Sequence, residues 1–364
     1  MTYVKTDRTH FHTFDSLRFL SFLLVFLRHS PVPENNFFYY FSKEGGIGVS
    51  FFFVLSGFLI TYILMHEKIN NQGKISLKNF FKRRMLRIWP LYYAMVLFAM
   101  ATPYILNFFN ISYSGQGYQP NWLFTLTFLE NYMMMYRGQF PNTSPLTVIW
   151  SLCIEEHFYI FWGLMFYFIS LKNVPRLLFC CIVFSFLMQM VYERFEWSTL
   201  DIFTNIHYFA FGAIPAYIFV CKKKNIEKLS EIPAEYKYGY AVTVFAAILT
   251  VANTDIIPNL KISSLLFSIL FSGLILCTLG DKNAFKISDR SITGRLGKYT
   301  YGLYLIHTIC ITVFIKMADT IGFNWIITII LSFLSTLLLS ILSYHLFEKQ
   351  FLRLKNKASG ILKA

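Results

Sequence analysis

Two ionisable side chains, Arg18 and His29, lie in the first apolar segment of the sequence. Their eleven-residue separation corresponds on an α-helix to three turns plus about 20°, so both project from one face, about 16 Å apart along the axis. An imidazole can act as a general base near neutral pH, and a guanidinium can bind anionic groups. Two structural alternatives stay open: Arg18 as an anchor at the membrane surface, and His29 as a hydrogen-bonded packing residue.

A basic run precedes the third apolar segment, and within it Arg84 and Arg87 are three residues apart. On a helix they share a face. Paired guanidinium groups at a membrane edge suit phosphate binding. The alternative is that the run sets membrane topology or contacts anionic lipid.

Two adjacent acids, Glu155 and Glu156, lie inside the apolar segment that starts near residue 149. An ionisable side chain in a membrane span costs at least about 2.5–3.5 kcal/mol, so such residues need a partner or a function. The two acids point about 100° apart on a helix, so at least one should face the interior. His307, in the ninth apolar segment, is a further candidate. Structural pairing with Arg or His is the alternative to catalysis.

The composition places these residues in a membrane protein. Of the 364 residues, 55% are hydrophobic and only 14% are charged, whereas soluble domains carry about 25% charged residues. This excludes a soluble enzyme, a disordered chain and a disulfide-stapled module. The cysteines show no disulfide framework or zinc spacing, and we expect no metal. The apolar windows predict an all-α, polytopic bundle of about ten transmembrane helices, with spans near 15–32, 47–66, 89–106, 149–171, 177–192, 201–221, 239–257, 262–280, 299–317 and 325–346.

Basic residues predict the orientation of the bundle. With both termini in the cytoplasm, 27 of the 33 lysines and arginines fall on the inner side, as the positive-inside rule requires. Membrane insertion therefore explains the net charge of +14 without a nucleic-acid partner. We expect a cytoplasmic tail at 1–14, a transmembrane domain at 15–346 and a basic cytoplasmic tail at 347–364. The polar N-terminus is unlike a cleaved signal peptide, so the first helix is expected to stay as an anchor.

Six motifs in order along the chain resemble the acyltransferase 3 family, integral membrane enzymes that O-acylate surface polysaccharides and other glycans. The motifs are Arg18 and His29 with ten residues between them, GIGVSFFFVLSGFLI at 46–60, Arg84-x-x-Arg87, Trp150-Ser151-Leu152-x-x-Glu155, YGLYLIH at 301–307 and Phe347-Glu348-x-x-Phe351. The similarity extends from about residue 14 to 353. Cys153 and His157 depart from the Ser and Gln that often stand at these positions.

The resemblance implies a cytoplasmic acyl-CoA donor, usually acetyl-CoA, and a hydroxyl acceptor on a polysaccharide or glycan beyond the cell (inner or plasma) membrane. On this hypothesis Arg84 and Arg87 bind the donor's phosphates with help from Arg18. His29 acts as general base, Glu155 orients it, and His307 is a second candidate base or acceptor-positioning group. Direct transfer and a covalent acyl-enzyme both stay open.

Two other classes fit the same residues. A proton-coupled transporter also has many spans with buried charges and histidines, although the two halves of this sequence show no repeated pair of broken helices. A non-catalytic scaffold for envelope synthesis is the third hypothesis. The aromatic outer loop at 107–148 is equally compatible with sugar stacking and with an interfacial aromatic belt.

Overall fold

The structure is a computed structural model that describes residues 9–43, 45–108, 110, 116–253 and 260–358. Within these ranges the chain is helical and contains no strand, only an isolated bridge between Tyr118 and Pro141, which confirms the all-α prediction. The long helices are α1 (Thr13–His29), α3 (Ile47–Asn70), α4 (Leu77–Phe108), α7 (Trp150–Phe168), α8 (Val174–Arg194), α9 (Ile202–Cys221), α11 (Ala234–Asn253), α12 (Leu260–Thr278), α14 (Thr300–Ile321) and α15 (Trp325–Ser343).

Shorter elements connect the long helices. They are α2 (Tyr39–Lys43), α5 (Trp122–Leu126), α6 (Glu130–Arg137), η1 (Ser144–Leu146), η2 (Leu171–Asn173), α10 (Lys223–Ser230), α13 (Ile292–Gly297), η3 (Tyr344–Glu348) and α16 (Lys349–Ala358). The sequence also predicts a turn at Pro258 and Asn259, between the spans 239–257 and 262–280, but this turn lies outside the described residues.

Six helical segments in the described ranges are long and apolar enough to cross a membrane: Ile47–Asn70, Leu77–Phe108, Leu171–Arg194, Ile202–Cys221, Thr300–Ile321 and Trp325–Leu354. They indicate a multi-pass membrane protein. Each of the ten predicted spans overlaps a long helix, but α1 has only 17 residues, and a spanning helix needs about 20. Ten crossings and cytoplasmic termini therefore stay predictions.

Helix α4 differs most from its predicted span. It begins at Leu77, twelve residues before the apolar window, and it contains Pro90 and Pro103. Hydropathy locates only the part of a helix that is apolar, so it missed the basic first turns. As a result, Arg84 and Arg87 project from the same continuous helix that enters the bundle.

Two glycines let α3 and α9 cross closely. A Cβ atom on Gly57 would lie 2.1 Å from the carbonyl oxygen of Phe209, and one on Gly212 would lie 1.9 Å from that of Val54. Any larger residue would separate the backbones. This crossing fixes α3, and with it Ser56, at the centre of the bundle.

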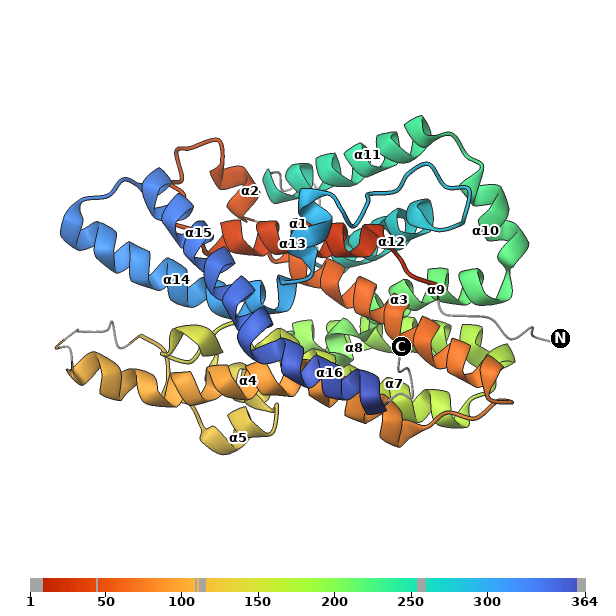
Figure 1. Cartoon of the computed structure of the whole chain (residues 1–364), viewed down its shortest axis with the longest axis horizontal. Helices are drawn as coiled ribbons and strands as arrows, with labels where there is room; N and C mark the ends of the chain where they lie inside the picture. Colours follow the sequence, from red (N-terminus) through yellow and green to blue (C-terminus); the bar gives the residue numbers. More distant parts are fainter. Residues whose placement is uncertain (1–8, 44, 109, 111–115, 254–259, 359–364) are drawn as a thin grey trace.

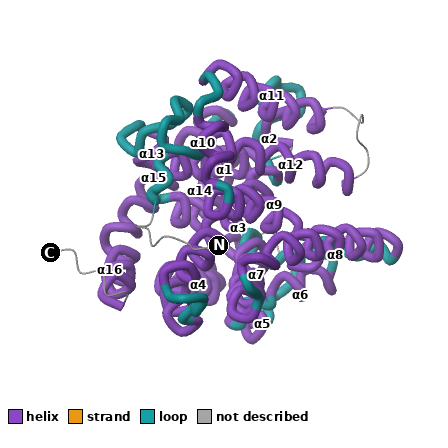
Figure 2. The backbone as a smooth tube through the Cα atoms, turned by 90° about the vertical axis from the view of Figure 1, so that its right-hand side faces the viewer, coloured by secondary structure: helices purple, strands orange, loops and turns teal. Residues whose placement is uncertain are grey.

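Figure 1 shows α1, α3, α4 and α14 running broadly along the long axis of the molecule, with α16 beside α4. α1 packs against α3, α13 and α14, and α16 packs against α4. Viewed from the end, α11 lies on one side of α1, and α4 and α7 lie on the opposite side (Figure 2). α1 is therefore an interior element, which is where a functional side chain can meet residues from several helices.

Candidate functional site

A cavity of about 490 Å³ lies among α1, α3, α4, α7 and α14, and α16 and the turn before it close one side. Four of the six predicted site residues line it: Arg18, Arg84, Arg87 and Glu155. Sequence positions from the first to the last third of the chain thus meet at one space. His29 and His307 are not part of its lining.

One end of the cavity is basic. Arg18 donates from Nη1 to Asp15 Oδ1 at 2.7 Å, so it is already paired one turn along α1. Arg84 and Arg87 make no ion pair within the described part of the chain. The Nε of Arg84 is buried without a hydrogen-bond partner, and its guanidinium carbon lies 6.0 Å from the ring centroid of Tyr159. These groups leave donors and positive charge available to an anion in the cavity.

The neighbouring Arg83 behaves differently, although it also lines the cavity. Its Nη2 lies 3.0 Å from Glu67 Oε2 on α3, and both side chains are largely buried. Glu67 Oε1 also accepts from the backbone N–H of Ser76, at 2.8 Å. Arg83 therefore ties the start of α4 to α3, and its charge is neutralised by a protein carboxylate.

Glu155 forms part of the cavity wall where α7 packs on α3. Its Oε1 accepts hydrogen bonds from Ser56 Oγ at 2.6 Å and from the Tyr159 hydroxyl. Glu156 points elsewhere: it does not line the cavity, and its Oε1 is buried without a hydrogen-bond partner. The expectation that at least one acid faces the interior is thus met by Glu155, the acid in the motif.

The Glu155 carboxylate makes no hydrogen bond to His29 among the described residues, and α7 packs on α3 rather than extensively on α1. The neighbour of His29 is His307, whose ring centroid lies 5.2 Å away. His29 is exposed at the end of α1, whereas His307 is completely buried. The geometry therefore favours His307 over Glu155 as the group that positions His29.

The protonation of His307 follows from its hydrogen bond. Its Nδ1 lies 2.7 Å from the carbonyl oxygen of Tyr304. A carbonyl can only accept, so Nδ1 carries the hydrogen and Nε2 keeps its lone pair. That Nε2 is buried and has no hydrogen-bond partner among the described residues, and the ring that carries it lies next to the ring of His29.

Tyrosines connect the cavity to the histidine pair. Tyr304 lines the cavity and lies one helical turn before His307. Its hydroxyl lies 2.6 Å from Ser151 Oγ, and the Tyr301 hydroxyl donates to the carbonyl of Ile88 at 2.6 Å. The histidine pair thus lies just beyond the wall of the cavity that Tyr304 forms.

Sequence reasoning missed Ser56 and Tyr159 as partners of Glu155. Tyr159 could have been found, because it follows Glu155 by four residues and so lies on the same helical face. Ser56 could not, because a serine in an apolar helix gives no indication of which distant residue it contacts. Its partner is 99 positions away in sequence.

Comparisons with known proteins identify the family of the chain. A family model described as an acyltransferase domain matches residues 11–345, so the chain belongs to the acyltransferase 3 family of membrane acyltransferases.

Among curated relatives, a putative peptidoglycan O-acetyltransferase, YrhL, from Bacillus subtilis (strain 168) is 29% identical over 85% of this chain and 50% of its own length. The peptidoglycan O-acetyltransferase OatA of Listeria monocytogenes is 26% identical over 94% of this chain and 56% of its own. The O-acetyltransferase OatA of Staphylococcus aureus is 27% identical over 84% and 52%. The chain thus spans about half the length of these relatives. No solved structure matches it.

Proposed function

We propose that this protein is a cell-membrane O-acyltransferase that moves an acyl group, in the first instance acetyl, from cytoplasmic acyl-CoA to a hydroxyl of a cell-wall or cell-surface glycan. The observation that carries the proposal is the cavity itself. It is lined by Arg84 and Arg87, which form no ion pair within the described residues, and by Tyr304, which lies next to a histidine pair. The names of the relatives favour peptidoglycan as the acceptor.

The donor would bind with its phosphates at Arg84 and Arg87. Guanidinium groups form charge-assisted hydrogen bonds with phosphate oxygens, and neither of these two forms an ion pair with a carboxylate within the described part of the chain. Arg18, already bonded to Asp15, would add positive charge from the opposite wall. The thioester would then extend past Ser56 and Glu155 towards Tyr304.

The histidine pair would carry the proton transfer. His29 would take the proton of the acceptor hydroxyl as that oxygen attacks the thioester carbonyl, and the C–S bond would break when the tetrahedral intermediate collapses. The CoA thiolate leaves and is protonated by the imidazolium, which balances the reaction. His307 would orient His29 through its free Nε2. Glu155 accepts hydrogen bonds from Ser56 and Tyr159, and it would hold in place the part of the cavity wall that faces the donor.

The test uses the protein reconstituted in lipid with radiolabelled acetyl-CoA and soluble peptidoglycan fragments. Coenzyme A release that depends on the added glycan, with label on a glycan hydroxyl, would support the proposal. Uptake of a solute without any chemistry would contradict it and favour a carrier. Radiolabel that stays on the protein after CoA release would show that transfer proceeds through a covalent acyl-enzyme and not directly.

A further inference from the structure

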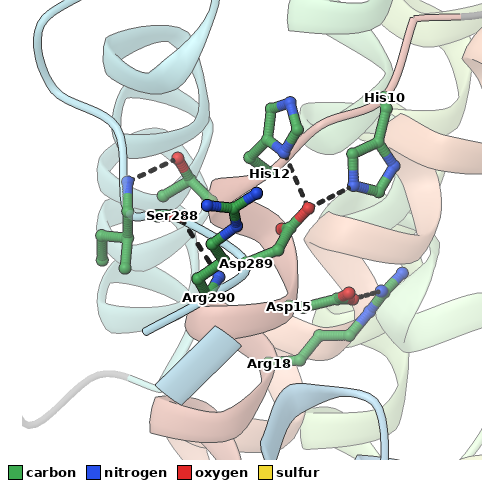
Figure 3. A network of polar contacts seen from close by, with 9 residues as sticks. His10, His12, Asp15, Arg18, Ser288, Asp289 and Arg290 are labelled. Atoms are coloured by element: carbon green, nitrogen blue, oxygen red, sulfur yellow. Dashed lines mark hydrogen bonds and ion pairs between the residues drawn. The ribbon is translucent and has the colours of Figure 1, made fainter. Parts of the chain in front are cut away.

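A second cluster of chemically capable side chains, His10, His12 and Asp289, adjoins the cavity through His10, which is one of its lining residues. His10 Nε2 and His12 Nδ1 lie 2.8 Å and 2.7 Å from the same carboxylate oxygen, Asp289 Oδ2. Potential ligand atoms of all three residues lie within 4.8 Å of one another. Figure 3 shows both rings directed at the carboxylate from the chain that leads into α1.

Both histidines are held in place from the backbone. His12 immediately precedes α1. His10 lies between Thr9, whose backbone N–H donates to the Tyr62 hydroxyl at 2.8 Å, and Phe11, whose ring packs edge-on against Phe58 at 4.9 Å. The alternation of anchored residues and histidines sends both imidazoles to the same side.

The loop that carries Asp289 is fixed to the same helix. The backbone N–H of Ile287 donates to Thr13 Oγ1 at 3.2 Å, and Thr293 Oγ1 donates to Ser16 Oγ at 3.0 Å. At Gly297 a Cβ atom would lie 2.0 Å from the carbonyl oxygen of Asp15, so α13 lies directly on α1. The carboxylate and the imidazoles are therefore presented by a common rigid support.

Asp289 has unused binding capacity. Its Oδ1 is buried without a hydrogen-bond partner. An ionised carboxylate beside two imidazoles is the donor set that zinc and similar divalent ions take in three-ligand sites.

We propose that His10, His12 and Asp289 bind a divalent transition-metal ion, and that zinc is the ion that fits this ligand set best. Ligand atoms around tetrahedral zinc lie about 2.0–2.2 Å from the metal, hence roughly 3.3 Å from one another. The present separations from Asp289 Oδ2 need to open by only about 0.5 Å. Side-chain exposures of 63%, 54% and 28% for His10, His12 and Asp289 give an ion in solution direct access and leave a fourth position for water.

The metal site would link two separate segments of the chain. It joins the segment before α1 to the loop before α13, and His10 also lines the large cavity. A bound ion would hold this segment in place where His10 lines the cavity. Asp289 is 277 or more residues away from the two histidines, and none of the ligands is a cysteine, so the cysteine spacings could not have indicated this site.

The experiment measures metal binding alone, so its failure leaves the proposed acyl transfer untouched. Full-length protein, purified in detergent without a polyhistidine tag and stripped of metal, is titrated calorimetrically with Zn²⁺. Co²⁺ serves as a second probe, because its visible absorption reports tetrahedral coordination. We expect one ion per chain and a Zn²⁺-dependent rise in Tm, as for any ligand that binds only the folded state.

The variants are His10→Ala and Asp289→Asn, with the exposed His345→Ala as matched control. Loss of even an outer partner of a metal ligand costs about 10–100-fold in affinity, so each variant should weaken Zn²⁺ binding at least about tenfold while His345→Ala leaves it unchanged. Size exclusion and metal-free Tm verify folding. Equal binding by wild type and both variants, or no binding by wild type, would overturn the proposal and leave a metal-free hydrogen-bonded cluster.

Discussion

The two ends of the candidate site are built in opposite ways. At the basic end, Arg84 and Arg87 form no ion pair within the described chain, and Arg84 keeps an unbonded buried N–H. At the other end, His307 is completely buried and its Nδ1 is bonded to the backbone. Groups left without protein partners suit a ligand that comes and goes, whereas a group locked by its own helix suits chemistry that needs one fixed geometry.

The largest loss of activity is expected from a substitution at the histidine end. We expect His29→Ala to lower kcat about 10²–10⁴-fold, the range for losing a general base, with little change in KM for acetyl-CoA. Single-turnover transfer in reconstituted protein measures this. His345→Ala controls for removal of an imidazole. An unchanged rate in folded His29→Ala would remove His29 from the reaction.

At the basic end, we expect a substitution to weaken the binding of acetyl-CoA. Arg84→Ala removes hydrogen bonds to a charged group, each worth about 1.5–3 kcal/mol, so we expect KM for acetyl-CoA to rise roughly 10–100-fold with a smaller change in kcat. Steady-state kinetics over donor concentration measures it. Lys82, an exposed neighbour that does not line the cavity, provides the control Lys82→Ala. A fall in kcat with KM unchanged would contradict the assignment of donor binding to the basic end and of proton transfer to the histidine end.

The wall between the ends depends on the α3–α9 crossing. Gly57→Ala would press a methyl group on the backbone at Phe209, and such overpacking costs about 1–3 kcal/mol. We expect a lower Tm in detergent, together with lower activity because Ser56 moves. Gly46→Ala is the control, since no atom lies within 4 Å of a Cβ built there. Equal Tm values for Gly57→Ala and the wild type would show that α3 and α9 can move apart without loss of stability.

The smallest effect is expected at Ser56, which supplies one of two hydrogen bonds to Glu155. One such bond is worth about 0.5–1.5 kcal/mol, so Ser56→Ala should slow transfer roughly 2–10-fold. Ser56→Thr keeps the hydroxyl and should recover part of the rate. A loss as large as that of His29→Ala would place Ser56 in the reaction itself.

Much of the site could be predicted because helical periodicity is local. The three-residue spacing of Arg84 and Arg87 placed both on the cavity side of α4, and the motif around Trp150 and Glu155 predicted the acid that lines the cavity. The apolar windows located the helices, but they began α4 twelve residues late because charged turns carry no hydropathy signal.

The partner of His29 was predicted less well. Glu155 was the expected partner by analogy with carboxylate–histidine pairs, but its hydrogen bonds go to Ser56 and Tyr159, and the neighbour of His29 is His307. Which of two buried groups meets a given histidine depends on the rotation of helices distant in sequence. Periodicity within one helix does not contain that information.

The sequence by itself determined the helical membrane class, the approximate helix positions and the residues able to do chemistry, because composition and periodicity act within each segment. Only the tertiary structure decided that Arg83 is neutralised by Glu67 while Arg84 forms no ion pair among the described residues, that the histidines pair, and that His10 and His12 converge on Asp289. These outcomes depend on which helix faces pack together, and that is set by close contacts between segments tens to hundreds of residues apart.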